Sequence, residues 1–405
     1  MNDFSYVEKL LDGVEVVWFP ISEVTERTTN IKWRETSERH QYIDLTSVSV
    51  DTKKIIETTE VKASNAPSRA QKLVKKDDVL FATTRPTQMR YCLIDEEYDG
   101  AVASTGYCVL RVKRDVTLPK WILHLISSSD FKKYLEENQS GSAYPAISDA
   151  KVKDFSIPIP CPDNLEKSLA IQAEIVRILD AFTAMTAELT AELNMRKKQY
   201  SHYQFELLKF TETTQQLTIG ECCDINKGAT PIKKATPGKY PLVATTEERQ
   251  SSSEYQFDCP AVCVPLISSR GHGVASIDRI YYQDGKFALG NILCAITPKD
   301  SEVLSAKFLR YYLFDKKDVL LVPLMRGGAN VSLTMDSLKK VKIPIPPIAD
   351  QQRIVRALDK FDEFVKALPR EIELRQKQYE YYRDLLLSFP ASPAGGPKSH
   401  SDEAA

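Results

Sequence analysis

The sequence predicts an α+β protein: two globular domains of mixed α/β structure joined by two long helices. Three observations predict this class: two long runs of regularly spaced apolar residues, an "IPIP" segment ahead of each run, and strand-like stretches such as "YCVLRVK" and "KFALGNILCAI". The chain of 405 residues, with 42% hydrophobic and 27% charged residues, has the length and composition of a globular protein of two or three domains.

An internal repeat divides the chain into two halves. "IVRILDAF" at residues 175–182 returns 179 positions later as "IVRALDKF", and "RKKQYSHYQFELLKF" at residues 196–210 returns as "RQKQYEYYRDLLLSF". Upstream, "GSAYPAISDAKVKDFSIPIP" at residues 141–160 parallels "GGANVSLTMDSLKKVKIPIP", 186 positions later, because the first copy holds seven extra residues. The "IPIP" prolines force extended backbone, so each globular unit is expected to end there.

The two long runs are expected to be helices that pack on one another along an apolar seam. A helix of about 40 residues is about 60 Å long, too long to be buried in one domain of this size. The residues alone leave parallel and antiparallel pairing open. Pro369 is expected to kink or split the second helix. Residues spaced alternately four and three apart form the expected seam: Ile175, Leu179, Phe182, Leu189, Leu193, Tyr200, Tyr203, Leu207, Ile354, Leu358, Phe361, Leu368, Ile372, Tyr379, Tyr382 and Leu386.

These features predict five segments. They are an N-terminal segment with the first globular domain (1–160), a central long helix (161–212), a second globular domain (213–346), a C-terminal long helix (347–389) and a disordered tail (390–405).

The sequence lacks the motifs of the common catalytic and metal sites. There is no GxxxxGK[ST] phosphate loop, no GxSxG nucleophile elbow and no HExxH zinc motif. The eight cysteines include no CxxC pair, so buried free thiols are expected rather than a metal site. No catalytic residue and no cofactor of its own are therefore expected. With no apolar run of about 18 residues and no signal-like N-terminus, the chain is expected to be cytoplasmic, without a membrane partner.

The repeat and its motifs resemble the specificity subunit of a type I restriction-modification system, most closely its IC branch. The resemblance rests on both "IPIP" segments, the helix starts at Gln172 and Gln352, the "RQKQYEYYRDLL" helix end, and "YVEKLLDGVEVVW" at residues 6–18. The "TAELTAEL" and "LPREIELRQKQYEYYRDLL" segments point to the IC branch.

The resemblance implies a role and partners for the chain. Each globular domain would be a target recognition domain reading one half of a bipartite, asymmetric site in double-stranded DNA. The long helices would form an antiparallel coiled coil, in a pseudo-two-fold arrangement, that sets the gap between the halves. Two adenine-methyltransferase (M) subunits carrying S-adenosylmethionine, and motor-nuclease (R) subunits using ATP and Mg, would be the partners.

Candidate DNA-binding residues lie in polar loops after predicted strands. Base edges are read by Arg, Lys, Asn and Gln side chains, and arginine can bond guanine at two points. For any one of these residues, an ordinary solvated side chain is the competing interpretation. The candidates are Arg85, Gln88, Arg90, Asn226, Lys227, Lys233, Lys234, Arg270, His272, Arg326 and Asn330, with Gln139 and Ser140 at the first-copy position that matches "RGGAN".

Two other functions compete with DNA reading. A net charge of −1 does not by itself indicate a nucleic-acid partner. A coiled-coil scaffold whose globular domains bind proteins would explain the helices, but not the two divergent domains that each end in "IPIP". A degenerate methyltransferase is disfavoured because its cofactor motifs are absent.

Overall fold

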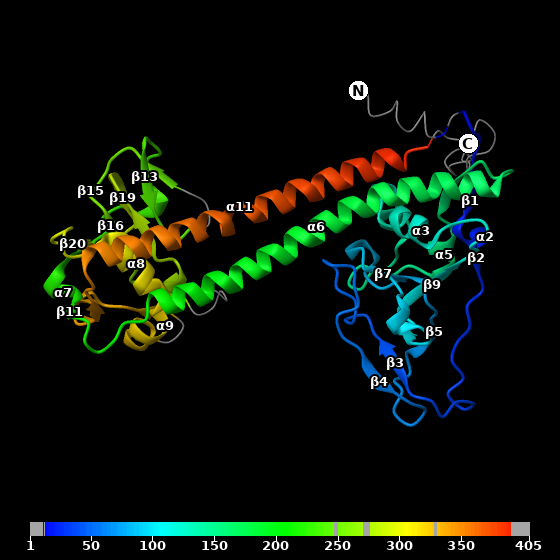
Figure 1. Cartoon of the computed structure of the whole chain (residues 1–405), viewed down its shortest axis with the longest axis horizontal. Helices are drawn as coiled ribbons and strands as arrows, with labels where there is room; N and C mark the ends of the chain where they lie inside the picture. The colour runs from blue at the N-terminus through cyan, green and yellow to red at the C-terminus, as the bar shows by residue number, and fades with distance from the viewer. Residues whose placement is uncertain (1–10, 12, 247–249, 270–275, 328–329, 390–405) are drawn as a thin grey trace. The chain divides into compact units, whose positions relative to one another are not determined.

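The computed structural model describes residues 11, 13–246, 250–269, 276–327 and 330–389 (Figure 1). The chain divides into two compact units. Unit 1 runs to Thr190 and resumes at Arg370, whereas unit 2 spans Ala191–Pro369. Each unit therefore contains one globular domain and part of each of the two long helices, α6 (Leu165–Leu207) and α11 (Ile348–Leu386).

Unit 1 contains two four-stranded sheets, ordered β2-β9-β6-β7 and β4-β3-β8-β5, and the two-stranded pair β1-β10. All neighbours are antiparallel except β3 and β8, which are parallel. Its elements are β1 (Val16–Pro20), α2 (Ile21–Val24), β2 (Thr25–Glu26), β3 (His40–Ile43), β4 (Thr59–Val61), β5 (Ala70–Leu73), β6 (Val79–Ala82), η1 (Pro86–Gln88), β7 (Tyr91–Leu93), η2 (Glu96–Tyr98), β8 (Val102–Ser104), β9 (Tyr107–Val112), α3 (Pro119–Leu125), α4 (Ser129–Asn138), α5 (Asp149–Asp154) and β10 (Ser156–Pro160).

Strand β6 is buried on both faces. Val79 and Phe81 belong to a core that also contains Trp121 from α3. The alternating residues Leu80 and Ala82 belong to a second core on the opposite face. The continuous apolar sequence of this strand follows from its central position.

Unit 2 repeats the strand order of unit 1. Its sheets are β12-β20-β16-β18 and β14-β13-β19-β15, with β13 and β19 parallel, beside the two-stranded pairs β11-β22 and β17-β21. Its elements are β11 (Gln216–Thr218), α7 (Ile219–Cys222), β12 (Cys223–Lys227), η3 (Ile232–Lys234), β13 (Tyr240–Val243), β14 (Gln250–Ser252), β15 (Phe257–Asp258), β16 (Ala261–Pro265), β17 (Ile267–Ser269), η5 (Ser276–Asp278), β18 (Tyr281–Gln283), β19 (Lys286–Leu289), β20 (Leu293–Pro298), α8 (Ala306–Asp315), α9 (Lys317–Leu320), η6 (Val322–Leu324), β21 (Asn330–Ser332), α10 (Met335–Lys339) and β22 (Lys342–Pro344).

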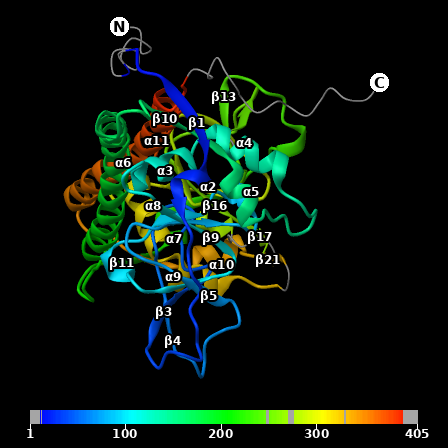
Figure 2. The same cartoon turned by 90° about the vertical axis from the view of Figure 1, so that its right-hand side faces the viewer.

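The first "IPIP" segment lies in strand β10, and the second begins in strand β22, which ends at Pro344. In unit 1, β10 pairs with β1 (Figure 2). Trp18 lies opposite Pro158 in this pair. In unit 2, β22 pairs with β11, with Leu217 opposite Ile343. Each pair has only two strands, so prolines at alternate positions need no ladder hydrogen bond on their outer side. The extended backbone predicted from these prolines is confirmed.

The two long helices pack on one another in each unit. In unit 1, Phe182 of α6 stacks on Tyr382 of α11 with ring centroids 5.3 Å apart. In unit 2, Tyr203 of α6 stacks on Phe361 of α11 at 5.2 Å. Helix α6 begins in unit 1 and ends in unit 2, whereas α11 begins in unit 2 and ends in unit 1, so the two helices run in opposite directions, which settles the orientation that the residues alone left open.

The expected split at Pro369 is wrong, because α11 runs through it without a break. Pro369 is exposed. A carbonyl that loses its helical hydrogen bond at an exposed proline can bond to water instead, so the helix continues.

Although α6 and α11 are long, neither contains an apolar stretch sufficient to cross a membrane, nor does any other helix in the described residues. All eight cysteines are free, and most of them are buried.

Candidate nucleic-acid interface

In unit 1, the hairpin of residues 140–146 and the segment that follows β6 form one surface. The hairpin closes through Ser140, whose backbone N–H donates to the Ala146 carbonyl at 2.9 Å. The Arg85 N–H donates to the Pro145 carbonyl at 2.7 Å, and the Ile147 N–H donates to the Thr83 carbonyl at 2.9 Å. Two candidate segments that lie far apart in the sequence are therefore adjacent.

Arg85 and Gln88 are both exposed on this surface. The Arg85 guanidinium lies 5.4 Å from the ring centroid of Tyr144, which is 73% exposed at the tip of the hairpin. Arg85 forms no ion pair with any described residue. Its guanidinium is positioned by the aromatic ring and not by a carboxylate.

Arg90 is placed differently, because it is half-buried and donates from Nη1 to the Val48 carbonyl. Beside it, the Lys53 ammonium donates to the Met89 carbonyl at 2.5 Å and lies 4.6 Å from the Tyr91 ring centroid. Burial, the largest cause, and the nearby Arg90 charge together lower the pKa of Lys53 to about 8, although Asp51 opposes the shift. Arg90 and Lys53 therefore stabilise the loop after β6 from its buried side.

Unit 2 carries the equivalent hairpin, 186 positions later. The Arg326 N–H donates to the Ser332 carbonyl at 3.0 Å, and Ser332 returns the bond at 2.8 Å. Gly141 and Gly327, at matching positions, have φ of 93° and 130°, so both hairpins turn through a backbone conformation that favours glycine.

The candidate residues of this second hairpin are only partly described. Arg326 is exposed. The backbone of Asn330 begins β21, which pairs with β17, but its side chain lies outside the described residues. Arg270 and His272 lie outside them entirely.

The remaining candidates lie at the end of β12 and in η3 of unit 2. Asn226 and Lys227 are exposed at the end of this strand and Lys234 is exposed in η3, whereas the Lys233 side chain is not described. Gln256 fixes the segment by donating to the Lys227 carbonyl at 2.9 Å and accepting from the Ala229 N–H at 2.8 Å.

Gly228 is required in this segment by a close approach of two backbones. A Cβ atom at this position would lie 2.2 Å from the Gly290 carbonyl oxygen. The exposed polar side chains of residues 226, 227 and 234 are therefore presented on a backbone that is fixed from both sides.

Tyr144 and Lys53 were missing from the candidates chosen from sequence. Tyr144 had a usable signal, since it stands 186 positions before the candidate Asn330. Lys53 had none, because its contact with the Met89 carbonyl joins segments that no repeat or motif relates.

Each globular domain is anchored to a long helix by a buried glutamine. In unit 1, Gln172 of α6 accepts from the Leu118 N–H at 3.1 Å and donates to the Val116 carbonyl at 3.1 Å. In unit 2, Gln351 of α11 accepts from the Ser305 N–H at 2.9 Å and donates to the Val303 carbonyl at 2.8 Å. The two pairs of bonds are equivalent, so the same kind of anchor positions each domain on its helix.

A second anchor lies eight residues, or about two turns, further along each helix. Asp180 bonds Lys120 at 2.6 Å and His124 at 3.0 Å. Burial alone would raise the pKa of Asp180, but these two hydrogen bonds outweigh it and hold the pKa below its ordinary value. The unit 2 counterpart, Asp359, bonds Lys307 and the Tyr311 hydroxyl, each at 2.8 Å.

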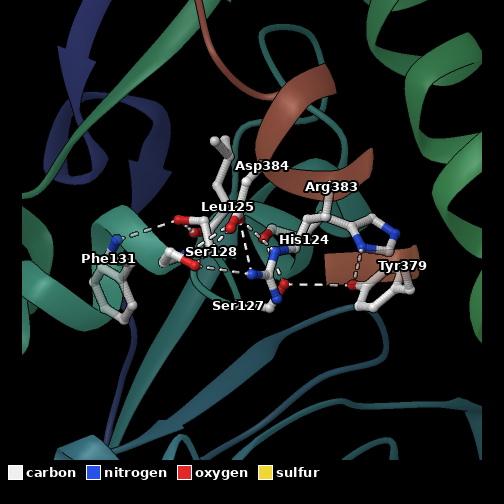
Figure 3. A network of polar contacts seen from close by, with 9 residues as sticks. His124, Leu125, Ser127, Ser128, Phe131, Tyr379, Arg383 and Asp384 are labelled. Atoms are coloured by element: carbon white, nitrogen blue, oxygen red, sulfur yellow. Dashed lines mark hydrogen bonds and ion pairs between the residues drawn. The ribbon is translucent and has the colours of Figure 1, made fainter. Parts of the chain in front are cut away.

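In unit 1, the His124 ring also contacts the other long helix, α11 (Figure 3). Its Nδ1 lies 3.2 Å from the Tyr379 hydroxyl of α11. Further along α11, Arg383 donates to Ser129 at 3.3 Å, and Ser129 donates to Asp384 at 2.5 Å. Helix α3 is thus tied to both long helices, and α4 is tied to α11.

The predicted seam is buried most completely near the globular domains. Ile175, Leu179 and Leu358 are fully buried. Tyr203 is 48% exposed although it stacks on Phe361. The assignment of the whole set to the seam stays a prediction.

Comparison with known proteins decides the family. A family model described as the type I restriction modification DNA specificity domain matches residues 14–196 and 211–374. The type I restriction enzyme EcoR124I/EcoR124II specificity subunit of Escherichia coli is 36% identical over 96% of this chain and 98% of its own. The chain belongs to the type I restriction-modification specificity family.

Other members of this specificity family show the same relationship. A putative type I restriction enzyme specificity subunit of Haemophilus influenzae is 29% identical over 96% of this chain and 99% of its own length. The type I restriction-modification S subunit of M. genitalium shares the fold with a TM-score of 0.58 at 14% identity, over 94% of this chain and 98% of that one. As a family of specificity subunits, it is non-catalytic, and the predicted α+β class with two repeated domains is confirmed.

Proposed function

We propose that this chain is the DNA-reading subunit of a type I restriction-modification complex, and that each domain reads one half of a bipartite, asymmetric DNA site. The observation that carries the proposal is the repeated strand order. Sheet β4-β3-β8-β5 of unit 1 and sheet β14-β13-β19-β15 of unit 2 have the same order and the same single parallel pair. One scaffold therefore presents two different sets of loop residues, as reading two different sequences requires.

The gap between the half-sites is set, in this proposal, by α6 and α11. The glutamine and aspartate anchors fix each domain on its helix, and the helices pair antiparallel in both units. A fixed helix length then corresponds to a fixed number of base pairs that are not read. The boundaries at residues 160, 212, 346 and 389 belong to the same proposal, since strand β10 or β22 closes each domain where a long helix follows.

The partners in this proposal are double-stranded DNA, two M subunits and the R subunits. The M subunits bind S-adenosylmethionine and methylate adenine at N6, and the R subunits use ATP and Mg. This chain contributes no cofactor and no catalytic group. Support comes from its similarity, over nearly the full length, to proteins named as specificity subunits of restriction enzymes.

Co-expression with a type I methyltransferase subunit tests the proposal. Genomic DNA from these cells is sequenced by a method that detects N6-methyladenine. The expected result is one bipartite motif with a constant gap, absent from cells that lack this chain. A stable complex with the methyltransferase but unmethylated DNA would instead support the scaffold function.

A further inference from the structure

We propose that Tyr144 and Arg85 act together as one reading element that determines one base pair of the half-site recognised by the first domain. The proposal rests on the proposed DNA-reading function and extends it to a specificity-determining residue, Tyr144, that no sequence motif assigns. Its ligand is the edge of a base pair in double-stranded DNA.

Exposure and charge make this pair suited to base reading. Tyr144 presents most of its ring to solvent, in a hairpin whose neighbouring residues Ser142 and Ala143 are small. Arg85 lies against that ring, and none of its guanidinium N–H groups bonds to a described residue. A cation–π contact restricts the guanidinium while leaving its donors available, and arginine donors match the two acceptors of guanine in the major groove.

The backbone beneath the pair is held in an unusual conformation. Arg85 and Met89, on either side of η1, have φ of 50° and 52°, and Lys53, which bonds the Met89 carbonyl, has φ of 55°. Non-glycine residues in this region carry strain, and such residues concentrate at functional sites where the surrounding structure fixes them. Three of them in one contacting group indicate a loop held in shape for a ligand.

The repeat identifies the same position independently. Both hairpins close through equivalent backbone bonds, and both contain a glycine of positive φ three residues before the position concerned. That position is Tyr144 in the first domain and Asn330 in the second. If the two domains read different sequences from one scaffold, an equivalent hairpin position with chemically different side chains is one at which their specificities can differ.

The test uses the full chain in complex with its methyltransferase subunit and maps the methylated motif of four variants: Tyr144→Ala, Tyr144→Phe, Arg85→Ala and the control Arg39→Ala. Arg39 is an exposed arginine of the same domain that is paired with Glu60 at 2.6 Å. Tyr144→Ala and Arg85→Ala are expected to relax the same single position of the first half-site, lowering discrimination there by about 5-fold or more. Tyr144→Phe is expected to keep most of it, since the ring remains.

The second half-site, the gap and the Arg39→Ala motif are expected to stay unchanged. The salt dependence of DNA binding by Tyr144→Ala is also expected to match the wild type, because no phosphate contact is lost. An unchanged motif in both alanine variants would overturn the proposal, as would loss of methyltransferase binding by Tyr144→Ala. If the wild-type complex itself yields no bipartite motif, the proposed function has failed, and this result is distinct from the other two.

Discussion

Gln172 and Gln351 stand 179 positions apart and form the same pair of hydrogen bonds to the loop ahead of α3 and of α8, respectively. Both side chains are completely buried. A buried backbone group left without a partner costs about 1–3 kcal/mol. Gln172→Leu leaves the Leu118 N–H and the Val116 carbonyl unpaired, so unit 1 is expected to lose about 2–4 kcal/mol of unfolding free energy.

Tryptophan fluorescence during urea unfolding measures this loss selectively, because all three tryptophans lie in unit 1. Gln351→Leu is the matched control, since it creates the equivalent defect in unit 2. It is expected to shift the transition seen by far-ultraviolet circular dichroism and to leave the fluorescence transition in place. Equal fluorescence shifts for the two variants would contradict separate anchoring of the two units.

Lys53 is expected to titrate near pH 8, because burial disfavours its charged form. The unfolded chain then binds more protons than the folded chain between about pH 8 and pH 10.5, so the Lys53 contribution makes the protein more stable as pH rises through this window. NMR of the protein with ¹³C-methylated lysines measures the midpoint, and Lys53→Gln assigns the signal.

Arg90→Gln provides the internal check on this titration. Removing the Arg90 charge is expected to raise the Lys53 midpoint, since that charge contributes to the shift. A Lys53 midpoint near 10.5 in the unaltered protein would show that the ammonium is solvated and does not support the loop.

The sequence predicted the elements that depend on local pattern. The "IPIP" prolines determine the extended strands β10 and β22, and four-three spacing determines α6 and α11, because these signals act over a few residues. The common strand order of the two domains could not be predicted, since pairing such as Tyr42 with Val102 joins distant segments of little sequence similarity.

The candidate site was predictable to a smaller degree, for the same reason. Loop position after a strand correctly indicated that Arg85 and Gln88 are exposed, but could not show that Arg90 turns inward to the Val48 carbonyl. Nor could it show that Tyr144 lies against Arg85, because that contact depends on a hairpin almost 60 residues further along the chain.

Deleting Thr190–Leu193, one "TAEL" unit of α6, is expected to shorten the unread gap and to leave both half-sites unchanged. Four residues span about 6 Å of helix, and DNA rises about 3.4 Å per base pair, so the change corresponds to about two base pairs. Methylation-site sequencing measures the gap directly. Thr190→Ala, which keeps the helix length and removes only the Thr190 bond to the Thr186 carbonyl, is the control and is expected to keep the original gap. Altered half-sites in the deletion variant would contradict the role of α6 as a spacer.

Circular permutation tests whether the two units are equivalent in construction. Leu11 and Phe389 share one core in unit 1, just as Phe210 and Leu217 pack against one core in unit 2. In unit 2 a short connection joins the end of α6 to β11, whereas in unit 1 the matching elements, α11 and β1, belong to opposite ends of the chain. Linking residue 389 to residue 11 through a flexible linker, and opening the chain between Thr213 and Thr214, is therefore expected to preserve the fold.

The permuted chain is expected to direct methylation to the same motif as the original. Thr213 is exposed in a turn, so new ends there break no strand and expose no core. The control opens the chain between Ile157 and Pro158 of the buried strand β10, and it is expected to abolish both folding and methylation. If both permutants fail, the connection from α6 to β11 contributes more than a covalent link, and the two units are not equivalent in construction.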